Sequence, residues 1–354
     1  MRVGVVGAGQ LARMLQQAAI PLGVDLRLLA TDPAEPALRV VPDSLVGATL
    51  AELADGCDVV TFEHELVDLD EVRALEADGV VVRPSASTLA SVVDKRATRT
   101  LLAEHDLPQP AWRPVETAAD VTLPAVLKAS RGGYDGRGVW EVIDEAGVAE
   151  VLASGLALLA EERVAIDQEL AVLVARRPNG EVAAYPVVET VQRDGICVEV
   201  LAPATVDDDV AKAATELAVE VAEAVGAVGL LAVELFRTGD RLLVNELAAR
   251  PHNSGHWTIE GTATSQFEQH LRAVLDLPLG PTAARAPAVA MANVIGGTDP
   301  QARLGEALTV GDVHVHLYGK APRAGRKLGH VTAVGDDLDE VRHRATRAAE
   351  VLSS

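Results

Sequence analysis

The chain has 354 residues, of which 49% are hydrophobic and 23% charged, a composition typical of a folded protein with two or three domains. Its formal net charge of −21 argues against electrostatic binding to nucleic acid or anionic membranes. The two cysteines, Cys57 and Cys197, predict neither a disulfide framework nor a metal site. The first residues lack the pattern of a signal peptide, and no apolar run approaches the roughly 18 residues of a membrane helix, so we expect a cytoplasmic protein.

The N-terminal part, residues 1–95, alternates strand-like and helix-like patterns. A short apolar run leads into a helical segment that should end near Gly23, and three further strand-like runs follow. The strand-like runs are residues 2–7, 25–30, 44–48 and 57–62. This alternation of strands and helices predicts an open parallel sheet.

A glycine motif lies between the first strand and the first helix. Its residues are Gly7, Ala8, Gly9, Gln10, Leu11 and Ala12, a spacing typical of dinucleotide-binding turns, and Asp32 stands where the ribose-binding acid is expected. A helix N-terminus with glycines can bind any phosphate, including that of a ribonucleotide. The same glycines can also serve only close packing of helix and strand. The motif alone leaves all three interpretations open, among them an NAD-dependent oxidoreductase.

The most informative stretch is a glycine-rich loop between two strand-like runs. Residues 94–106 predict a capped helix that begins at Asp94, and the apolar run after it carries Lys128 into four glycines within residues 132–138. Glycine lets backbone amides approach an anion, and the lysine adds a positive charge. The common phosphate loops lead into a helix, whereas this loop lies between strands, as in the flexible loop that covers ATP phosphates in kinases.

Two glutamates interrupt the apolar strands of a predicted hairpin. We expect strands at 169–176, 182–189, 229–237 and 241–247, and helices at 209–226 and 264–276. The turn Thr238-Gly239-Asp240 would place Glu234 and Glu246 on one face of the hairpin. Two carboxylates buried together need a cation, and Mg²⁺ suits such a pair. Asn245 would point to the opposite face of an ideal strand, unless a strand end or a bulge redirects it.

Two loops near the C-terminal end gather polar and basic side chains. Residues 250–256 form the run RPHNSGH directly after the hairpin, and loops at strand ends often carry function. Residues 278–289 predict a linker by their proline and alanine content. After it, a basic cluster without any acid predicts an anion pocket in an otherwise acidic chain; its members are Lys320, Arg323, Arg326, Lys327 and His330.

Seven segments together resemble a known family. They are GAGQLARM, VVTFEHE, RPSASTLASVVDK, LPAVLKASRGGYDGRG, YPVVETVQRDGI, LLVNELAARPHNSGHWTIEGTATSQFEQHLRAVLDLPLG and HLYGKAPRAGRKLGH. The chain resembles the N5-carboxyaminoimidazole ribonucleotide synthetases of the ATP-grasp superfamily over nearly its whole length. The resemblance implies an α/β (α+β) protein with an open-sheet pre-ATP-grasp domain (1–95), an ATP-grasp domain with a glycine-rich flap (96–280) and a small C-terminal domain (281–354).

The resemblance also implies a reaction. Bicarbonate and ATP would form carboxyphosphate, and its carbon would be joined to the amine of 5-aminoimidazole ribonucleotide in purine biosynthesis, with ADP and phosphate as products. Expected cofactors are ATP and Mg²⁺ or Mn²⁺, and the expected assembly is a homodimer. Another ATP-grasp carboxylate–amine ligase, such as the formate-dependent glycinamide ribonucleotide transformylase, is the alternative; the RPHNSGH and GRKLGH loops argue against it.

The site residues implied by the resemblance fall into four groups. Nucleotide contacts are Lys95, Lys128, Gly132, Gly133, Tyr134, Asp135, Gly136, Arg137, Gly138, the adenine hinge Glu161, Glu162, Arg163 and Val164, the ribose-binding Glu169, and Gln192, Asn245 and Glu246. The metal ligands are Glu234 and Glu246. The expected catalytic residues are Tyr134, Asp135, Arg137, Arg250 and His252. The residues expected to bind the ribonucleotide are Gly9, Gln10, Leu11, Asn253, Lys320, Arg326 and Lys327. Gln192 stands where some relatives carry histidine.

Overall fold

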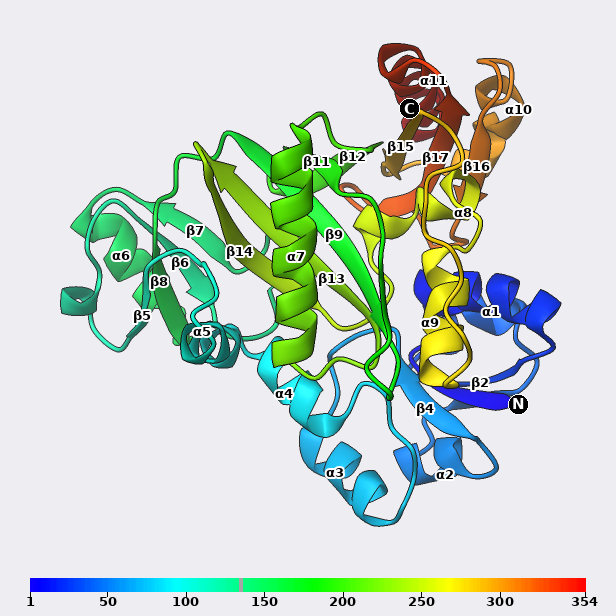
Figure 1. Ribbon diagram of the computed structural model, residues 1–354, viewed down its shortest axis with the longest axis horizontal. Helices are drawn as coiled ribbons and strands as arrows, with labels where there is room; N and C mark the ends of the chain where they lie inside the picture. The colour runs from blue at the N-terminus through cyan, green and yellow to red at the C-terminus, as the bar shows by residue number, and fades with distance from the viewer. Residues whose placement is uncertain (134–135) are drawn as a thin grey trace.

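The computed structural model describes residues 1–133 and 136–354 (Figure 1). Its N-terminal part is built on a four-stranded parallel sheet of order β3-β2-β1-β4, as the sequence predicts. The strands are β1 (Arg2–Val6), β2 (Asp25–Ala30), β3 (Ser44–Val46) and β4 (Val59–Phe62). Helix α1 (Gln10–Leu22) ends at Gly23, whose φ of 63° lies in the left-handed region that glycine adopts easily.

Short helices complete this N-terminal part. They are η1 (Pro36–Arg39), α2 (Leu50–Ala54), α3 (Leu69–Ala77) and α4 (Ala86–Val93). Helix α5 (Lys95–Glu104) follows directly, and the Asp94 side chain caps it by accepting from the Arg96 amide, as predicted. The two helices lead the chain from the first sheet toward the second.

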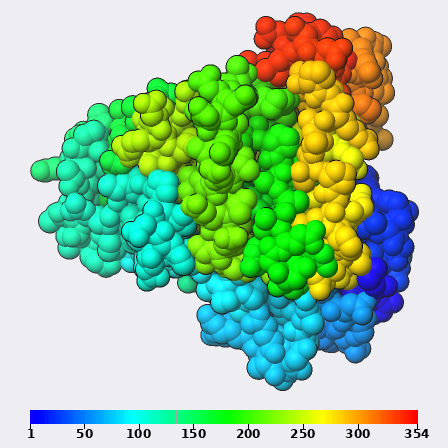
Figure 2. Space-filling view, viewed as in Figure 1, coloured from blue at the N-terminus to red at the C-terminus, as the bar shows by residue number. Residues whose placement is uncertain are grey.

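A second sheet forms a small lobe that projects from the main body (Figure 2). Its order is β5-β8-β6-β7, with antiparallel pairing throughout. The strands are β5 (Trp112–Val115), β6 (Ala125–Ala129), β7 (Val139–Val142) and β8 (Leu158–Glu162), accompanied by η2 (Ala118–Asp120) and α6 (Glu145–Leu152). Because β6 and β7 pair as a hairpin, the glycine-rich loop is the connection between two neighbouring strands, as expected.

The third sheet has nine strands and continues across the expected boundary at residue 280. Its order is β14-β13-β9-β11-β12-β15-β17-β16, with β10 paired to β9. Its strands are β9 (Gln168–Arg176), β10 (Val182–Ala184), β11 (Val188–Arg193), β12 (Ile196–Ala202), β13 (Gly229–Thr238), β14 (Arg241–Ala248), β15 (Ala288–Ile295), β16 (His314–Leu317) and β17 (Lys327–Gly335). Since β12 pairs with β15, the C-terminal segment extends the large sheet of the middle segment.

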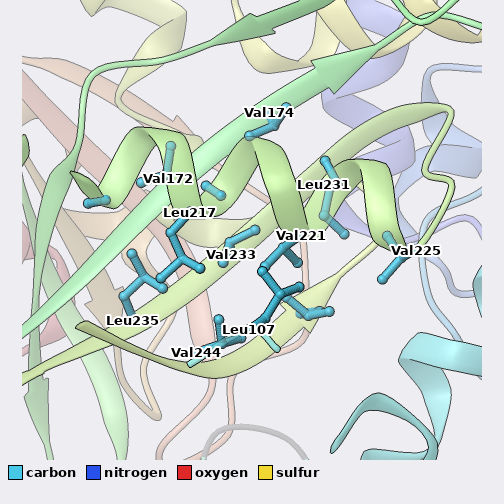
Figure 3. Close-up of a cluster of buried hydrophobic side chains, with 14 of the residues drawn as sticks. Leu107, Val172, Val174, Leu217, Val221, Val225, Leu231, Val233, Leu235 and Val244 are labelled. Atoms are coloured by element: carbon cyan, nitrogen blue, oxygen red, sulfur yellow. The ribbon is translucent and has the colours of Figure 1, made fainter. Parts of the chain in front are cut away.

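The remaining helices accompany this large sheet. They are α7 (Asp208–Ala224), η3 (Asn253–Gly255), α8 (Thr258–Gly261), α9 (Gln266–Val274), η4 (Pro300–Arg303), α10 (Leu304–Ala307) and α11 (Leu338–Ser353). Of these, α7, α9 and α11 pack directly against the strands of the sheet. Figure 3 shows Leu217 and Val221 of α7, with Val225 directly after the helix, packed over β9, β13 and β14. A separate hydrophobic cluster joins this part of the chain to the N-terminal part. In it, Phe267 and Leu271 of α9 pack with residues of α1.

One predicted strand is wrong in its extent. The sequence predicts a continuous strand at 182–189, whereas β10 ends at Ala184 and β11 begins at Val188. Pro186, between them, has no amide hydrogen to donate to a neighbouring strand. The Tyr185 ring is buried there, and its hydroxyl donates to the Thr264 carbonyl oxygen at 2.8 Å.

Two absences hold for the described part of the chain. None of its helices is both long and apolar enough to cross a membrane. Within the same residues, neither Cys57 nor Cys197 forms a disulfide bond.

His270 of α9 joins the first and third sheets, and this contact predicts a pH dependence of stability. Its Nδ1 accepts from the Leu230 amide at 3.1 Å, so its Nε2 carries the hydrogen that reaches the Thr61 hydroxyl at 2.8 Å. Burial lowers the pKa of His270 to about 3. The folded protein therefore keeps His270 neutral, while the unfolded chain protonates it near its ordinary pKa.

We expect the free energy of unfolding to fall as the pH drops from about 6.5 toward 3, with about 2 kcal/mol lost through His270 at pH 5. His270→Gln should be less stable at pH 7 and should lose that part of the pH dependence, as measured by urea denaturation from pH 7.5 to 5. His343→Gln, at an exposed position of α11, is the control. Equal slopes for His270→Gln and the unchanged protein would contradict the assignment.

Candidate active site

The two predicted carboxylates face each other across the β13–β14 hairpin. Glu234 pairs directly with Glu246, and the two-residue connection Gly239-Asp240 closes the hairpin. The next pair is Leu235 with Val244, which leaves Asn245 as the extra residue of a β-bulge. The prediction that Glu234 and Glu246 share a face is confirmed.

The bulge turns Asn245 toward that same face. Its Nδ2 lies 3.4 Å from Glu234 Oε2, and its Oδ1 accepts from the Lys128 ammonium group at 3.0 Å. An ideal strand would have pointed this side chain to the other face. The bulge therefore gathers three oxygen-bearing side chains, Glu234, Asn245 and Glu246, in one place.

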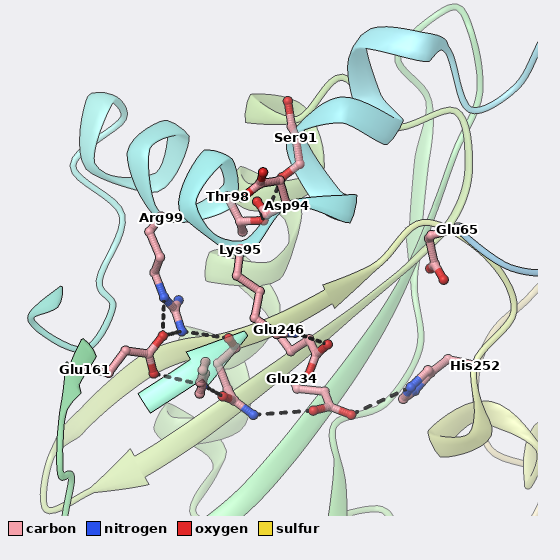
Figure 4. Close-up of polar contacts among 12 residues, drawn as sticks. Glu65, Ser91, Asp94, Lys95, Thr98, Arg99, Glu161, Glu234, Glu246 and His252 are labelled. Carbon is pink, nitrogen blue, oxygen red and sulfur yellow. Dashed lines mark hydrogen bonds and ion pairs between the residues drawn. The ribbon is translucent and has the colours of Figure 1, made fainter. Parts of the chain in front are cut away.

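Cationic side chains from α5 and β6 surround these carboxylates (Figure 4). Lys95 Nζ lies 2.6 Å from Glu246 Oε1. Lys128, buried on β6, also lies 2.8 Å from Glu161 Oε2, and Arg99 lies 2.7 Å from the other oxygen of Glu161. Lys95, Lys128 and Asn245 thus come together as the resemblance implies, and the Glu161 side chain joins them.

Arg99 is a residue that the sequence did not single out. Its guanidinium group donates to the carbonyl oxygens of Val244 at 2.7 Å and Asn245 at 2.8 Å, the two residues at the bulge. Arg99 lies one helical turn after Lys95 on α5, so both side chains lie on one face of the helix. This spacing is the one feature of the sequence that could have pointed to Arg99. Arg99 therefore holds the backbone of the bulge while Lys95 binds the carboxylate beside it.

Burial and charge shift the pKa values of this cluster in opposite directions. Burial, together with the carboxylates of Glu246 and Glu169, raises the pKa of Glu234 to about 7. Burial also disfavours the ionised form of Glu161, but Lys128 and Arg99 outweigh it and hold the pKa of Glu161 below its ordinary value. Glu161 is therefore neutralised by protein cations, whereas Glu234 is short of positive charge.

Other expected nucleotide residues lie around this cluster. Burial raises the pKa of Glu169 on β9, and the Gln192 side chain hydrogen-bonds to it, so the two lie together. In the expected adenine hinge, Glu162 accepts from the Ala111 amide and Arg163 pairs with Glu141, while Val164 is half-buried. The Glu161 side chain turns away from the hinge toward Lys128 and Arg99, so what remains for a base at that residue is its backbone.

The glycine-rich flap begins at a fixed base. Arg131 Nε and the Ser130 hydroxyl both donate to the Asp94 carboxylate, which ties the start of the flap to the cap of α5. Gly132, Gly136 and Gly138 have φ values near +75°, a region that favours glycine. Tyr134 and Asp135 lie outside the described residues; Gly133, Gly136, Arg137 and Gly138 lie in the described part of the loop. A Cβ on Gly136 would stand 3.2 Å from Gly195, so the flap reaches the β11–β12 turn of the large sheet.

The loop after β14 continues the site beyond Glu234. Arg250 Nε donates to Glu65 Oε2 of the N-terminal part at 2.8 Å. His252 Nδ1 accepts from the Ser254 amide, so the ring hydrogen lies on Nε2, which stands 3.7 Å from Glu234 Oε1. Burial lowers the pKa of His252 to about 3, so the ring is neutral. Sequence reasoning singled out Arg250 and His252 but missed Glu65.

The N-terminal glycine turn holds carboxylates of its own chain. The amides of Gly9 and Ala12 donate to Glu63, and the amide of Ala8 donates to Glu35 at 3.0 Å. A Cβ on Gly7 would stand 2.4 Å from the Glu63 side chain, which shows how closely Glu63 fills the turn. The pyrophosphate of a dinucleotide would compete with Glu63 for these amides, which argues against the dinucleotide interpretation. Asp32 binds the Ala34 amide within its own turn.

The basic cluster spans a loop and the first residues of β17. Lys320 Nζ lies 5.7 Å from the centre of the Tyr318 ring, and Arg326 donates to the Ala321 carbonyl oxygen at 3.1 Å. Lys327 begins β17. His330 was expected in the same loop but is fully buried in β17, where its Nδ1 meets the Tyr318 hydroxyl at 2.9 Å.

Three family descriptions match successive parts of the chain. They are a ribonucleotide synthetase preATP-grasp domain (residues 1–93), an ATP-grasp domain (100–267) and a phosphoribosylaminoimidazole carboxylase C-terminal domain (289–344). A protein of Mycobacterium tuberculosis named N5-carboxyaminoimidazole ribonucleotide synthase is 50% identical over 99% of this chain and 87% of its own length. The chain belongs to the N5-carboxyaminoimidazole ribonucleotide synthase family.

Solved structures of this synthase family have the same fold. The enzyme from Thermus thermophilus is 39% identical, with a TM-score of 0.89 over 100% of this chain and 99% of that chain. The Aspergillus clavatus synthase complexed with ATP is 35% identical, with a TM-score of 0.92 over 99% of this chain and 98% of that chain. A second Aspergillus clavatus structure, in complex with ADP and 5-aminoimidazole ribonucleotide, is 34% identical, with a TM-score of 0.91 over the same shares. The predicted ATP-grasp fold and the predicted family are confirmed.

The Arg99 contacts generate a prediction about nucleotide binding. Arg99→Lys keeps a positive charge near Glu161, but a single ammonium group cannot replace the planar fork that reaches the Val244 and Asn245 carbonyl oxygens together. We expect ADP to bind about tenfold more weakly, the effect of about one lost hydrogen bond to a charged group, as measured by isothermal titration calorimetry.

Arg96→Lys is the matched control for this experiment. Arg96 lies on the same helix and also donates to carbonyl oxygens, those of Leu158 and Val115, but none of these belongs to the bulge. Equal losses of ADP affinity in both variants would show that Arg99 stabilises α5 generally and has no special effect on the bulge.

Proposed function

We propose that this protein carboxylates 5-aminoimidazole ribonucleotide with bicarbonate, at the expense of ATP, to form N5-carboxyaminoimidazole ribonucleotide, ADP and phosphate. The observation that carries the proposal is the 3.7 Å approach of His252 Nε2 to Glu234 Oε1. This contact joins the carboxylate–lysine cluster suited to a nucleotide with the RPHNSGH loop suited to a second reactant. The relatives' names, and the relative solved with ADP and the ribonucleotide, support the same assignment.

At the nucleotide end, Lys95 and Lys128 would contact the ATP phosphates. Both ammonium groups lie at the carboxylate cluster already, so binding requires no long movement of charge. Residues 132–138 would close over the phosphates, and Glu161 to Val164 would line the adenine. Glu169, whose pKa burial raises, would bind the ribose with Gln192 beside it.

A divalent cation, Mg²⁺ or Mn²⁺, would be held by Glu234 and Glu246. The donor set fits, because carboxylate and amide oxygens are the ligands such ions prefer and because the raised pKa of Glu234 marks a place short of positive charge. Among the described residues, no three His, Cys, Asp or Glu side chains form a group that could hold an ion, so phosphate oxygens and water would complete its shell. When bound, the ion would neutralise charge that develops on the transferred phosphoryl group.

The reaction would then proceed in three steps. A bicarbonate oxygen attacks the γ-phosphorus, and the bond to the ADP oxygen breaks, giving carboxyphosphate. The C–O bond of carboxyphosphate breaks, giving CO₂ and phosphate. The exocyclic amine attacks CO₂, forming the C–N bond and releasing one proton from nitrogen. Arg250 and neutral His252 would hold the bicarbonate-derived species, and Tyr134, Asp135 and Arg137 on the flap would help to keep water out.

The ribonucleotide would lie between the N-terminal turn and the basic loop. Lys320, Arg326 and Lys327 would bind its phosphate with the turn Gly9–Gln10–Leu11, and Asn253 would contact the same substrate. Because the Gly9 amide already donates to Glu63, the substrate would use the neighbouring amides or displace that carboxylate.

Three further expectations carry over from the sequence and from its resemblance to the family. We propose a division of the chain at residues 1–95, 96–280 and 281–354, a homodimeric assembly and a cytoplasmic location.

The decisive assay is phosphate release from ATP and bicarbonate, with and without 5-aminoimidazole ribonucleotide. We expect strong stimulation by that ribonucleotide and none by formate with glycinamide ribonucleotide. Glu234→Gln, which keeps the size of the side chain but not its charge, should lose most of the stimulated activity. Phosphate release that does not respond to 5-aminoimidazole ribonucleotide would refute the proposed function.

A further inference from the structure

Two asparagines from distant parts of the chain bind each other at the substrate end of the site. Asn253, in η3 directly after His252, donates from Nδ2 to Asn293 Oδ1 at 3.0 Å. Asn293, on β15, donates from its own Nδ2 to Asn253 Oδ1 at 2.8 Å. Asn293 is buried, with 6% of its surface exposed, whereas Asn253 is half-buried. The pair therefore links the RPHNSGH loop to the large sheet.

A third contact fixes which way both amides point. The remaining hydrogen of Asn293 Nδ2 is donated to the Cys197 carbonyl oxygen at 2.9 Å. If Asn293 were turned over, its own Oδ1 would face that carbonyl oxygen, and two acceptors would meet. Asn293 has one stable orientation as a result, and Asn253 must present its amide edge to match.

The fixed orientation leaves Asn253 with defined groups for a ligand. One Nδ2 hydrogen and one lone pair of Oδ1 are not used by Asn293. Such a donor and acceptor suit a ribose hydroxyl or an amine beside a ring nitrogen. A free asparagine could exchange its donor and acceptor by turning over, and the partner on β15 prevents this.

The position of Asn293 also connects the loop to the basic cluster. β15 pairs with β17 so that Asn293 lies opposite His330 and Ile295 lies opposite Lys327. Asn253 is thereby held against β15, the strand that pairs with β17, in which Lys327 lies. The amide pair sets the loop relative to the residues expected to bind the substrate phosphate.

We propose that Asn293 is a positioning residue for the ribonucleotide: it holds the Asn253 amide in the single orientation that binds this substrate. The inference rests on the proposed function, because it assumes that Asn253 contacts the ribonucleotide. It goes beyond that function by giving a buried residue of the C-terminal sheet a part in substrate recognition.

The first test is Asn293→Asp, which has nearly the same shape but cannot donate to Asn253 Oδ1 or to the Cys197 carbonyl oxygen. We expect KM for 5-aminoimidazole ribonucleotide, and its dissociation constant measured calorimetrically with ADP present, to rise about tenfold. KM for ATP should not change. Asn293→Ala, which removes the hydrogen bonds without adding a charge, answers the same question should the aspartate variant fail to fold.

The matched control is Gln269→Glu. Gln269 is another fully buried amide with two reciprocal hydrogen bonds, to the amide and the carbonyl oxygen of Gly280, and neither residue is among those expected at the site. The Gln269→Glu variant should have a lower melting temperature and an unchanged KM for the ribonucleotide. A rise in that KM as large as for Asn293→Asp would assign the effect of Asn293 to general stability and overturn the inference.

A double-mutant cycle separates this inference from the proposed function. Asn253→Ala should weaken ribonucleotide binding, and adding Asn293→Ala should weaken it no further, because Asn293 acts through Asn253. If Asn253→Ala weakens binding but Asn293→Ala and Asn293→Asp do not, the positioning role is refuted while the substrate site stands. If Asn253→Ala leaves binding unchanged, both the substrate contact and the positioning role are refuted.

Discussion

The β-bulge at Asn245 is the feature on which the site depends. One extra residue in β14 lets Asn245 share a face with Glu234 while Glu246 still stands directly opposite Glu234. Without the bulge, Asn245 would point to the opposite face, and the cluster would lose its contact to Lys128. A local irregularity of the backbone thus places two carboxylates and one amide on the same face of the hairpin.

Cations from two other elements make this arrangement stable before any ligand binds. Arg99 covers the carbonyl oxygens of the bulge, Lys95 neutralises Glu246, and Lys128 bridges Asn245 and Glu161. Removing charged groups from water is costly unless each finds a partner, and in this cluster nearly every charge has one. Glu234 is the exception, since its pKa is raised to about 7, and this is the place where an added cation would be most favourable.

Local patterns predicted the parts of the molecule that depend on neighbours in sequence. The α5 cap at Asp94, the hairpin around Gly239 and the parallel N-terminal sheet all follow from propensity and periodicity. Contacts between distant segments could not be predicted in this way. Glu63 fills the N-terminal turn from 54 residues away, and the pairing of Asn293 with Asn253 spans 40 residues, with nothing in the sequence around either residue to mark it. The direction of Asn245 required the position of the bulge, which depends on contacts with Arg99.

The most direct test is to locate a Mn²⁺ ion by its anomalous scattering in crystals grown with ADP. We predict a peak between the carboxylates of Glu234 and Glu246, with Glu246 drawn from its contact with Lys95 toward the ion. An ion held by neither carboxylate, with Lys95 still bound to Glu246, would contradict the view that the bulge exists to assemble a cation site.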